Sequence, residues 1–208
     1  MSRPATPDEQ SGGDQGALEG YELLVCVCGG IAAYKTATVV STLVQEGCGV
    51  TVAMTRNARR FVGPLTYQAL TGRKVYSNPW RDAADGDQRH LTLTETADLV
   101  LVAPATANII GKLAGGIADD LVSTLLIGAG APVMIAPAMN TRMWSHPAVT
   151  RNVAFLRESG FEVAGPDSGW LACRTIGEGR MLEAADLIKA VRERLLAAKP
   201  RQHSLNKG

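Results

Sequence analysis

Three residues are candidates for chemistry because each stands in an unusual local sequence. Asn140 lies in the segment PAMNTRMW, directly after the apolar run APVMIA, where an amide held at the end of a buried strand could grip a ligand. His90 is one of only three histidines and opens the segment HLTLTETA. Cys173 lies in the glycine-rich stretch SGWLACRTIGEGRM, which is long for a structureless loop, and such loops are often lids.

Each of these residues also has an ordinary structural explanation. A single histidine is usually a surface residue or a hydrogen-bonded core residue, an asparagine often forms a turn, and a cysteine often packs as a small buried hydrophobe. Taken one at a time, these explanations are favoured. They lose weight if the fold brings all three residues to one edge of a sheet.

The elements that would position these residues alternate along the chain. Strand-like apolar runs lie at 21–28, 49–54, 97–104, 132–137 and 161–165. Helical patterns lie at 31–47, 107–116, 119–130, about 146–159 and about 183–197, and short helices are expected within 56–72. The first helix places Ala33, Ala37, Val40 and Val44 on one face and ends at Gly47.

Continuous apolar strands, each followed by a helix, indicate a parallel sheet that is covered on both faces. Right-handed crossovers then give a single doubly wound α/β domain, Rossmann-like or flavodoxin-like. Ligands of such sheets bind outside the carboxyl ends of the strands. We therefore expect the function to lie in the loops that follow the strands.

The loop CGGIAAYK, residues 28–35, could bind an anion, because glycine lets backbone amides approach a phosphate at a helix N-terminus. A plain tight turn explains it equally well. The loop lacks the pattern G-x-G-x-x-G, and the second strand ends in Met54-Thr55 without an acidic residue for a ribose. The sequence thus argues against NAD and leaves room for a mononucleotide with one phosphate.

Three further side chains have two interpretations each. Thr55 and Thr106 could cap the helices that follow them or could donate their hydroxyls to a ligand. Asn108 follows in the same loop, APATAN, as a further polar group. Phe61 could lie in the core, which is the more general case, or could lean on a flat ring.

Length and composition set the outer limits. The 208 residues suffice for one domain, which we place at 21–198, between a disordered leader at 1–20 and a flexible tail at 199–208. The net charge of +1 gives no case for binding to nucleic acid or to an anionic membrane, and the apolar runs are too short to span a membrane.

No signal peptide opens the chain, so the four cysteines are expected to be reduced in a cytoplasm. Cys26-x-Cys28 lacks the second ligand pair of a zinc site, so we predict no metal.

Four segments together resemble the homo-oligomeric flavin-containing cysteine decarboxylases. They are GGIAAYK, HLTLTETADLVLVAPATANIIGKLAGGIADDLVST, PAMNTRMW and GPDSGWLACRTIGEGRM, within a likeness that covers about 21–192. The closest likeness within that family is to the phosphopantothenoylcysteine decarboxylases of coenzyme A biosynthesis. The combination of Pro-Ala-Met-Asn, a lid cysteine and a histidine that heads HLTL is highly specific, whereas the Gly-Gly turn alone is not.

The resemblance implies bound FMN, a small-molecule substrate, and a trimer or a multiple of trimers with sites between subunits. It implies that His90 is the active-site base, that Asn140 holds the substrate carboxylate, and that Cys173 protonates an intermediate. It assigns further substrate contacts to Met143, Ala172 and Arg174. It assigns FMN contacts to Gly29, Gly30, Ile31, Thr55, Phe61, Thr106, Ala107, Asn108, Ile109, Ala138 and Met139.

The reaction that the resemblance implies is decarboxylation of 4′-phosphopantothenoylcysteine to 4′-phosphopantetheine. One departure from the family pattern is Arg174, where glycine is expected; a cation beside a thiol favours the thiolate, and a large side chain affects how the lid folds. The preceding ligase step would need a second domain, so this chain alone is not expected to perform it.

Three alternatives stay open. A peptidyl-cysteine decarboxylase stops at the ene-thiol and needs no lid cysteine, so Cys173 argues against it. A flavin prenyltransferase of related fold is disfavoured by the Pro-Ala-Met-Asn motif. A non-catalytic regulatory relative that binds partner proteins is disfavoured by the presence of His90, Asn140 and Cys173 together.

Overall fold

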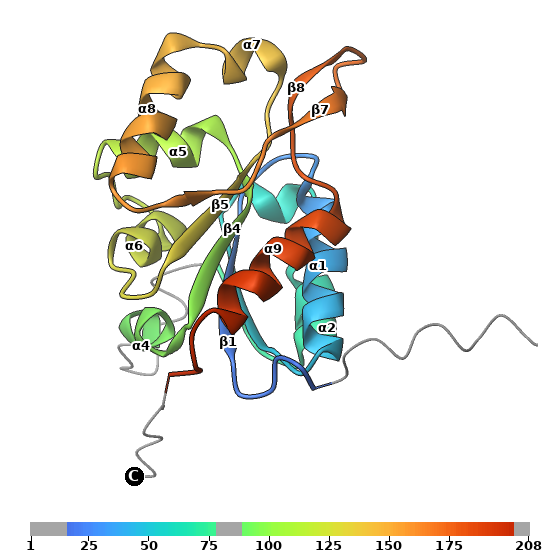
Figure 1. Cartoon of the computed structure of the whole chain (residues 1–208), viewed down its shortest axis with the longest axis vertical. Coiled ribbons are helices and arrows are strands. Elements are labelled where there is room, and N and C mark those ends of the chain that lie inside the picture. The colour runs from blue at the N-terminus through green and yellow to red at the C-terminus, as the bar shows by residue number, and fades with distance from the viewer. Residues whose placement is uncertain (1–15, 78–88, 202–208) are drawn as a thin grey trace, which may run out of the picture.

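The computed structural model describes residues 16–77 and 89–201, with the backbone alone for residues 89–92. Six parallel strands form one sheet in the order β3-β2-β1-β4-β5-β6 (Figure 1). Their bounds are β1 Glu22–Val27, β2 Gly49–Met54, β3 Val75–Tyr76, β4 Leu99–Ala105, β5 Val133–Pro137 and β6 Glu162–Val163. This is the Rossmann order, and without the short edge strand β3 the other five follow the flavodoxin order. The predicted doubly wound α/β fold is confirmed.

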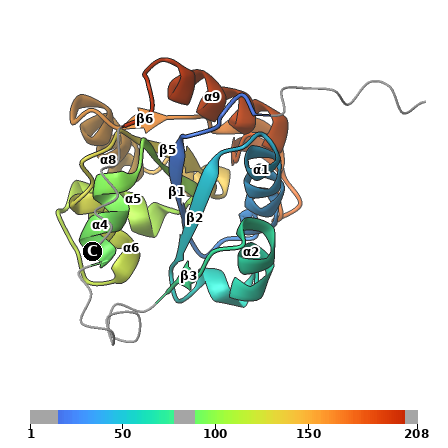
Figure 2. The same cartoon turned by 90° about the horizontal axis from the view of Figure 1, so that it is seen from below.

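Helices cover both faces of this sheet. Those on one face are α1 Ala33–Gln45, α2 Pro64–Thr71 and α9 Ala184–Leu196. Those on the other are α4 Arg89–Thr96, α5 Ala107–Ala114, α6 Leu121–Ile127 and α8 Pro147–Glu158 (Figure 2). The 3-10 turn η1 Ala58–Arg60 follows β2, and the short helix α7 Thr141–Trp144 follows β5.

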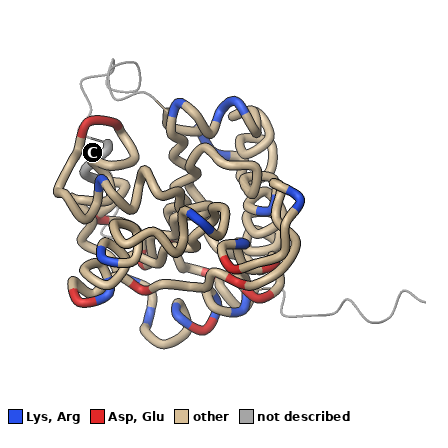
Figure 3. Tube along the Cα trace, turned by 90° about the horizontal axis from the view of Figure 1, so that it is seen from above, with Lys and Arg blue, Asp and Glu red and all other residues tan. Residues whose placement is uncertain are grey.

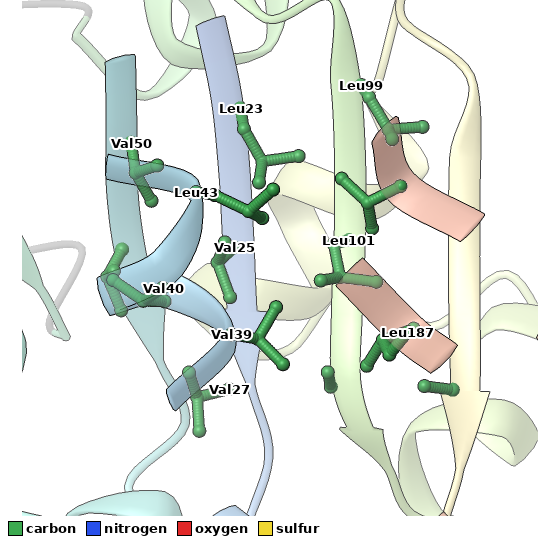
Figure 4. Close-up of a cluster of buried hydrophobic side chains, with 14 of the residues drawn as sticks. Leu23, Val25, Val27, Val39, Val40, Leu43, Val50, Leu99, Leu101 and Leu187 are labelled. Atoms are coloured by element: carbon green, nitrogen blue, oxygen red, sulfur yellow. The ribbon is translucent and has the colours of Figure 1, made fainter. Parts of the chain in front are cut away.

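The core consists of two clusters, one on each side of the sheet, because successive strand residues point to opposite faces. Leu23, Val25 and Val27 of β1 pack with Val39, Val40 and Leu43 of α1 (Figure 4). Leu24 and Cys26 of the same strand belong to the cluster on the other face. All residues of β4 are buried, which explains why its sequence is apolar throughout rather than alternating.

Five elements were not predicted, namely β3, α4, α7 and the two strands of a hairpin. β3 has only two residues, and α4 carries threonines that favour strand as much as helix. The glycine-rich stretch forms an antiparallel hairpin, β7 Asp167–Trp170 and β8 Ile176–Arg180, rather than a structureless loop. Its glycines and exposed side chains conceal the alternation by which a strand is predicted.

The predicted domain boundaries are wrong by a few residues at both ends. Leu18 is fully buried and its amide donates to the Glu46 carbonyl, so residues 16–20 belong to the folded domain. At the other end Asp98, which directly precedes β4, accepts hydrogen bonds from the amides of Glu22 and Arg201, each at 2.7 Å. The expected leader and tail otherwise lie outside the described residues.

Figure 3 shows Lys and Arg positions interspersed with Asp and Glu positions along the described chain trace. No helix within these residues has the length and apolar character that crossing a bilayer requires.

Candidate functional site

A cavity of about 920 Å³ opens at the carboxyl ends of the strands, where the loops after β1, β2, β4 and β5 meet the hairpin. β1 and β4 are neighbours at the point where the strand order reverses, which is the expected ligand position in such a sheet. The predicted residues that line this cavity are Gly29, Gly30, Ile31, Thr55, Thr106, Ala107, Asn108, Ile109, Ala138, Met139, Asn140, Met143, Ala172 and Cys173.

Three predicted site residues are not among those that line the cavity. Phe61 is half exposed, so the core interpretation of this side chain is wrong. Arg174 is exposed at the hairpin tip. His90 lies in α4 by its backbone, and its side chain lies outside the described residues.

The two glycines after β1 serve different purposes. A Cβ on Gly29 would clash with Asn57 of the β2 loop, so packing within the chain requires glycine there. A Cβ on Gly30 would meet only Pro104 and Thr106, both at 3.7 Å, which is ordinary contact. Packing within the chain therefore does not require glycine at position 30. The missing side chain instead leaves the cavity wall open to a ligand.

The same loop presents backbone donors. Among the described residues, the amides of Gly29, Ile31 and Ala32 have no hydrogen-bond acceptor, and all three residues line the cavity. Unpaired amides ahead of a helix are the groups that bind a phosphate. The loop therefore fits the phosphate of a mononucleotide.

Thr55 and Thr106 cap local structure and keep a donor free. The Thr55 hydroxyl oxygen accepts from the Ala58 amide at 3.2 Å, and the Thr106 hydroxyl oxygen accepts from the Ile109 amide at 3.4 Å. In both cases the cap uses the oxygen, so the hydroxyl hydrogen is left for a ligand. The capping role and the ligand role are thus compatible.

Asn140 is the N-cap of α7, and the cap determines which way its amide faces. Oδ1 accepts from the Met143 amide at 2.9 Å. The Nδ2 group, with its two N–H donors, is therefore on the side that the cap does not use. Donors without a full charge, at the wall of a cavity, can hold a carboxylate.

The hairpin packs directly on the Asn140 turn. The Met139 amide donates to the Gly179 carbonyl at 2.9 Å, and a Cβ on Gly179 would clash with the Met139 carbonyl oxygen. Gly179 also has φ of +122°, a conformation that favours glycine. Close backbone contact between β8 and residues 139–140 thus requires glycine at this position.

Cys173 lies at the tip of the hairpin. It is exposed, so the interpretation as a buried hydrophobe is wrong, and its Sγ is 3.1 Å from Thr175 Oγ1. The Leu171 amide donates to the Thr175 carbonyl at 2.8 Å, which closes a three-residue loop. Arg174, the last residue of that loop, has φ of +64°, the left-handed conformation that glycine would adopt without strain.

Charged side chains complete the wall, and the sequence analysis did not single them out. Lys35 and Arg180 both donate to Glu183 Oε1, at 3.0 and 3.1 Å. Arg56 is exposed and has no ion-pair partner among the described residues. Basic residues next to strand ends could have predicted these side chains as part of the site. Lysine and arginine are, however, also common on any solvated surface, so the pattern is weak.

Lys112 and Asp120 form an ion pair at the cavity wall, at 2.6 Å. Burial raises the pKa of Asp120, but hydrogen bonds from Lys112 and Ser123 outweigh burial and hold that pKa below its usual value. Burial, with a smaller effect of the Asp120 charge, raises the pKa of the nearby Cys28 thiol to about 12. Cys28 is therefore a neutral packing residue of the wall.

Comparison with protein families adds the decisive observation. The family model described as Flavoprotein matches residues 13–196. The chain belongs to the flavoprotein family. A flavin is therefore the ligand of the family site. The unpaired amides, the open wall at Gly30 and the free hydroxyls fit the phosphate of a flavin mononucleotide.

Relatives of this flavoprotein include the coenzyme A biosynthesis bifunctional protein CoaBC of Bacillus subtilis. It is 48% identical over 172 residues, which are 83% of this chain and 42% of that protein. The CoaBC protein of Mycolicibacterium smegmatis is 44% identical over 165 residues, 79% of this chain and 39% of that protein. The flavoprotein chain thus spans less than half the length of the curated relatives that it matches.

Two solved structures share the fold over nearly their full length. The FMN-dependent cysteine decarboxylase SpaF is 33% identical with a TM-score of 0.73, over 86% of this chain and 98% of that one. A PPC decarboxylase mutant complexed with pantothenoylaminoethenethiol is 27% identical with a TM-score of 0.75, over 83% of this chain and 97% of that one. The predicted family resemblance is confirmed.

Proposed function

We propose that this flavoprotein binds FMN and decarboxylates 4′-phosphopantothenoylcysteine to 4′-phosphopantetheine in coenzyme A biosynthesis. The observation that carries the proposal is that Asn140 and Cys173 line the same cavity as the phosphate-binding loop. The similarity to CoaBC proteins and to a PPC decarboxylase supports the choice of substrate. The hairpin that carries Cys173 favours the full reaction over an arrest at the ene-thiol.

The residues that would hold FMN are those with free donors around the loop after β1. The amides of Gly29 and Ile31 and the Thr55 hydroxyl would hold the phosphate, and Ala138 and Met139 would lie near the ring. FMN held there would supply a two-electron acceptor for the thiol-bearing carbon of the substrate and a donor for the later reduction.

The chain's own residues hold the substrate and move protons. Asn140 holds the carboxylate through Nδ2 without a full positive charge, so the ground state is not over-stabilised. His90 takes a proton during oxidation of the substrate to a thioaldehyde, and loss of CO2 then gives an ene-thiolate. Cys173 supplies the proton when that ene-thiolate is reduced, so the reaction has no net redox change.

The test uses the flavin-loaded full chain with 4′-phosphopantothenoylcysteine, anaerobically, with CO2 and product mass as readouts. We expect 4′-phosphopantetheine from the wild type. We expect CO2 and an ene-thiol from Cys173→Ser, since a serine hydroxyl is a far weaker acid than a thiol. A wild type that stops at the ene-thiol would instead indicate a peptidyl-cysteine decarboxylase, and a chain that cannot bind flavin would exclude both reactions.

We further propose that the chain acts as a homotrimer, or a multiple of trimers, in the cytoplasm. Ile31, Tyr34 and Trp170 line the cavity yet are 58%, 60% and 62% exposed, which leaves apolar surface at the cavity mouth for a neighbouring subunit. Sedimentation of the flavin-loaded protein is expected to give a multiple of three chains. A flavin-loaded, monodisperse monomer would exclude this assembly.

A further inference from the structure

The hairpin is joined to the domain by hydrogen bonds and ion pairs near its base, whereas most of its tip is exposed. At the base, Arg180 is bonded to Glu183, which also holds Lys35 of α1. One residue earlier, the Gly179 carbonyl accepts from the Met139 amide. Trp170 and Ile176, at the start of the tip, are 62% and 79% exposed, whereas the Leu171 side chain is buried at the cavity wall.

Thr141 makes the hydrogen bond to the hairpin that lies nearest its tip. Its Oγ1 donates to the Glu178 carbonyl at 2.8 Å. Within the described part of the chain, no other hydrogen bond joins the hairpin to the rest of the domain closer to the tip. A Cβ on Gly177 would clash with the same Oγ1, so β8 comes as close to Thr141 as a glycine backbone permits.

We propose that Thr141 is a positioning residue that fixes the hairpin tip relative to the Asn140 turn. Thr141 directly follows Asn140 and begins α7. The turn that carries the ligand-holding amide therefore also holds strand β8 of the hairpin. The hydroxyl thereby sets where Cys173 lies relative to Asn140. The role of Cys173 in this inference rests on the proposed function.

Loss of the hydrogen bond between Thr141 and the Glu178 carbonyl has a defined chemical consequence. Oxidation of the substrate and loss of CO2 precede the step in which Cys173 donates its proton, so these steps do not require the Cys173 thiol. Reduction of the ene-thiolate does depend on it, because the thiol must lie within reach of the carbon that receives the proton. Loss of the Thr141 hydroxyl should therefore release more ene-thiol without slowing the formation of CO2.

The first measurement is amide hydrogen exchange in the flavin-loaded full chain. Thr141→Val removes the hydroxyl at nearly constant shape, and Thr141→Ser retains it. Ser145→Ala is the matched control, because the Ser145 hydroxyl lies in the same segment and bonds the Thr141 carbonyl rather than the hairpin. We expect exchange of the Leu171 and Arg174 amides to be about three- to tenfold faster in Thr141→Val, the factor for one lost hydrogen bond, and unchanged in the other two.

The second measurement is the ratio of ene-thiol to 4′-phosphopantetheine released by the same variants. We expect the ratio to rise at least threefold in Thr141→Val while the rate of CO2 formation stays within twofold of the wild type. Thr141→Ser should restore the wild-type ratio, which a general loss of stability would not do.

The outcomes separate the two proposals. Unchanged exchange in Thr141→Val would show that the hydroxyl does not hold the hairpin. Faster exchange with an unchanged product ratio would show that it holds the hairpin but does not position Cys173. If the wild type makes neither product, the proposed reaction is wrong, and the exchange measurement alone then decides whether Thr141 fixes the hairpin.

Discussion

Asn140 combines a structural contact and a free donor in one side chain. Its Oδ1 caps α7, and this contact leaves the Nδ2 donors for a ligand. The turn interpretation and the ligand interpretation of this residue are therefore both compatible with the same geometry. The caps formed by Thr55 and Thr106 follow the same principle, because each uses the oxygen and leaves the hydrogen.

This geometry predicts that Asn140→Asp keeps the fold and the flavin but loses turnover. Aspartate caps a helix as well as asparagine does, so the free energy of unfolding should change by less than about 0.5 kcal/mol. The donors become a second carboxylate, and repulsion of the substrate at roughly 4 Å is on the order of a few kcal/mol at an intermediate dielectric. Steady-state rates on flavin-loaded protein measure this, and wild-type activity in the variant would reject the role of Asn140.

Among elements, the hairpin carries a local strain that the sequence does not reveal. Arg174 occupies a left-handed position that disfavours a side chain by about 1–2 kcal/mol, and glycine would relieve that strain. The resemblance led us to expect glycine at this position, and the left-handed backbone of Arg174 is consistent with that expectation.

Arg174→Gly is therefore expected to stabilise the closed hairpin turn by about 1 kcal/mol. The measurement is the exchange rate of the Leu171 amide, which donates across the loop and should exchange about fivefold more slowly. Arg174→Ala, which keeps a Cβ in the left-handed position, is the control and should show no such slowing. Equal exchange in the glycine variant and the wild type would contradict the assignment of strain.

The N-terminus of α6 gives a pH-dependent prediction. Asp120 caps this helix through a hydrogen bond from the Ser123 amide at 2.8 Å, and it pairs with Lys112. Because its pKa is lower in the folded chain than the usual value near 3.9, its contribution is present above about pH 4. That contribution is lost as the pH falls through the lower, folded-state pKa.

Asp120→Ala should therefore lower the free energy of unfolding by about 1 kcal/mol at pH 7. The difference from the wild type should begin to shrink below about pH 4 and be lost as the pH falls through the lower, folded-state pKa of this carboxyl. Urea unfolding across this pH range measures both values. A difference that stays constant down to pH 2 would show that the charge of Asp120 plays no part.

How far the sequence predicts each element depends on how its stability is encoded. β1, β2, β4 and β5 are buried on both faces, so their apolar runs identify them almost to the residue. The hairpin is held by contacts with residues 139–141, far away in the sequence, and its own composition carries no strand signal. The predicted loops meet at one cavity because parallel strands end at one edge, but the contributions of Lys35, Arg180 and Glu183 depend on packing that no local pattern encodes.

For the whole molecule, the family site links ligand binding to folding. The cavity wall is assembled from loops that follow four different strands, so the unfolded chain cannot bind FMN in the same way. FMN at 100 times its Kd should raise the free energy of unfolding by about 2.7 kcal/mol, a Tm increase of roughly 5–10 °C for a domain of this size. Riboflavin, which lacks the phosphate, should give a smaller shift, and equal shifts at matched concentrations would contradict the phosphate loop.

The Asp98 contact also defines where a tether can be attached. Asp98 fixes the Arg201 backbone at the amino end of β4, whereas the cavity lies at the carboxyl end of that strand. A seven-residue parallel strand spans about 23 Å. A surface linker or a fluorescent reporter joined after position 201 would thus be attached at the end of the sheet opposite the cavity. Protein immobilised through such a linker would keep its cavity mouth open to the solution.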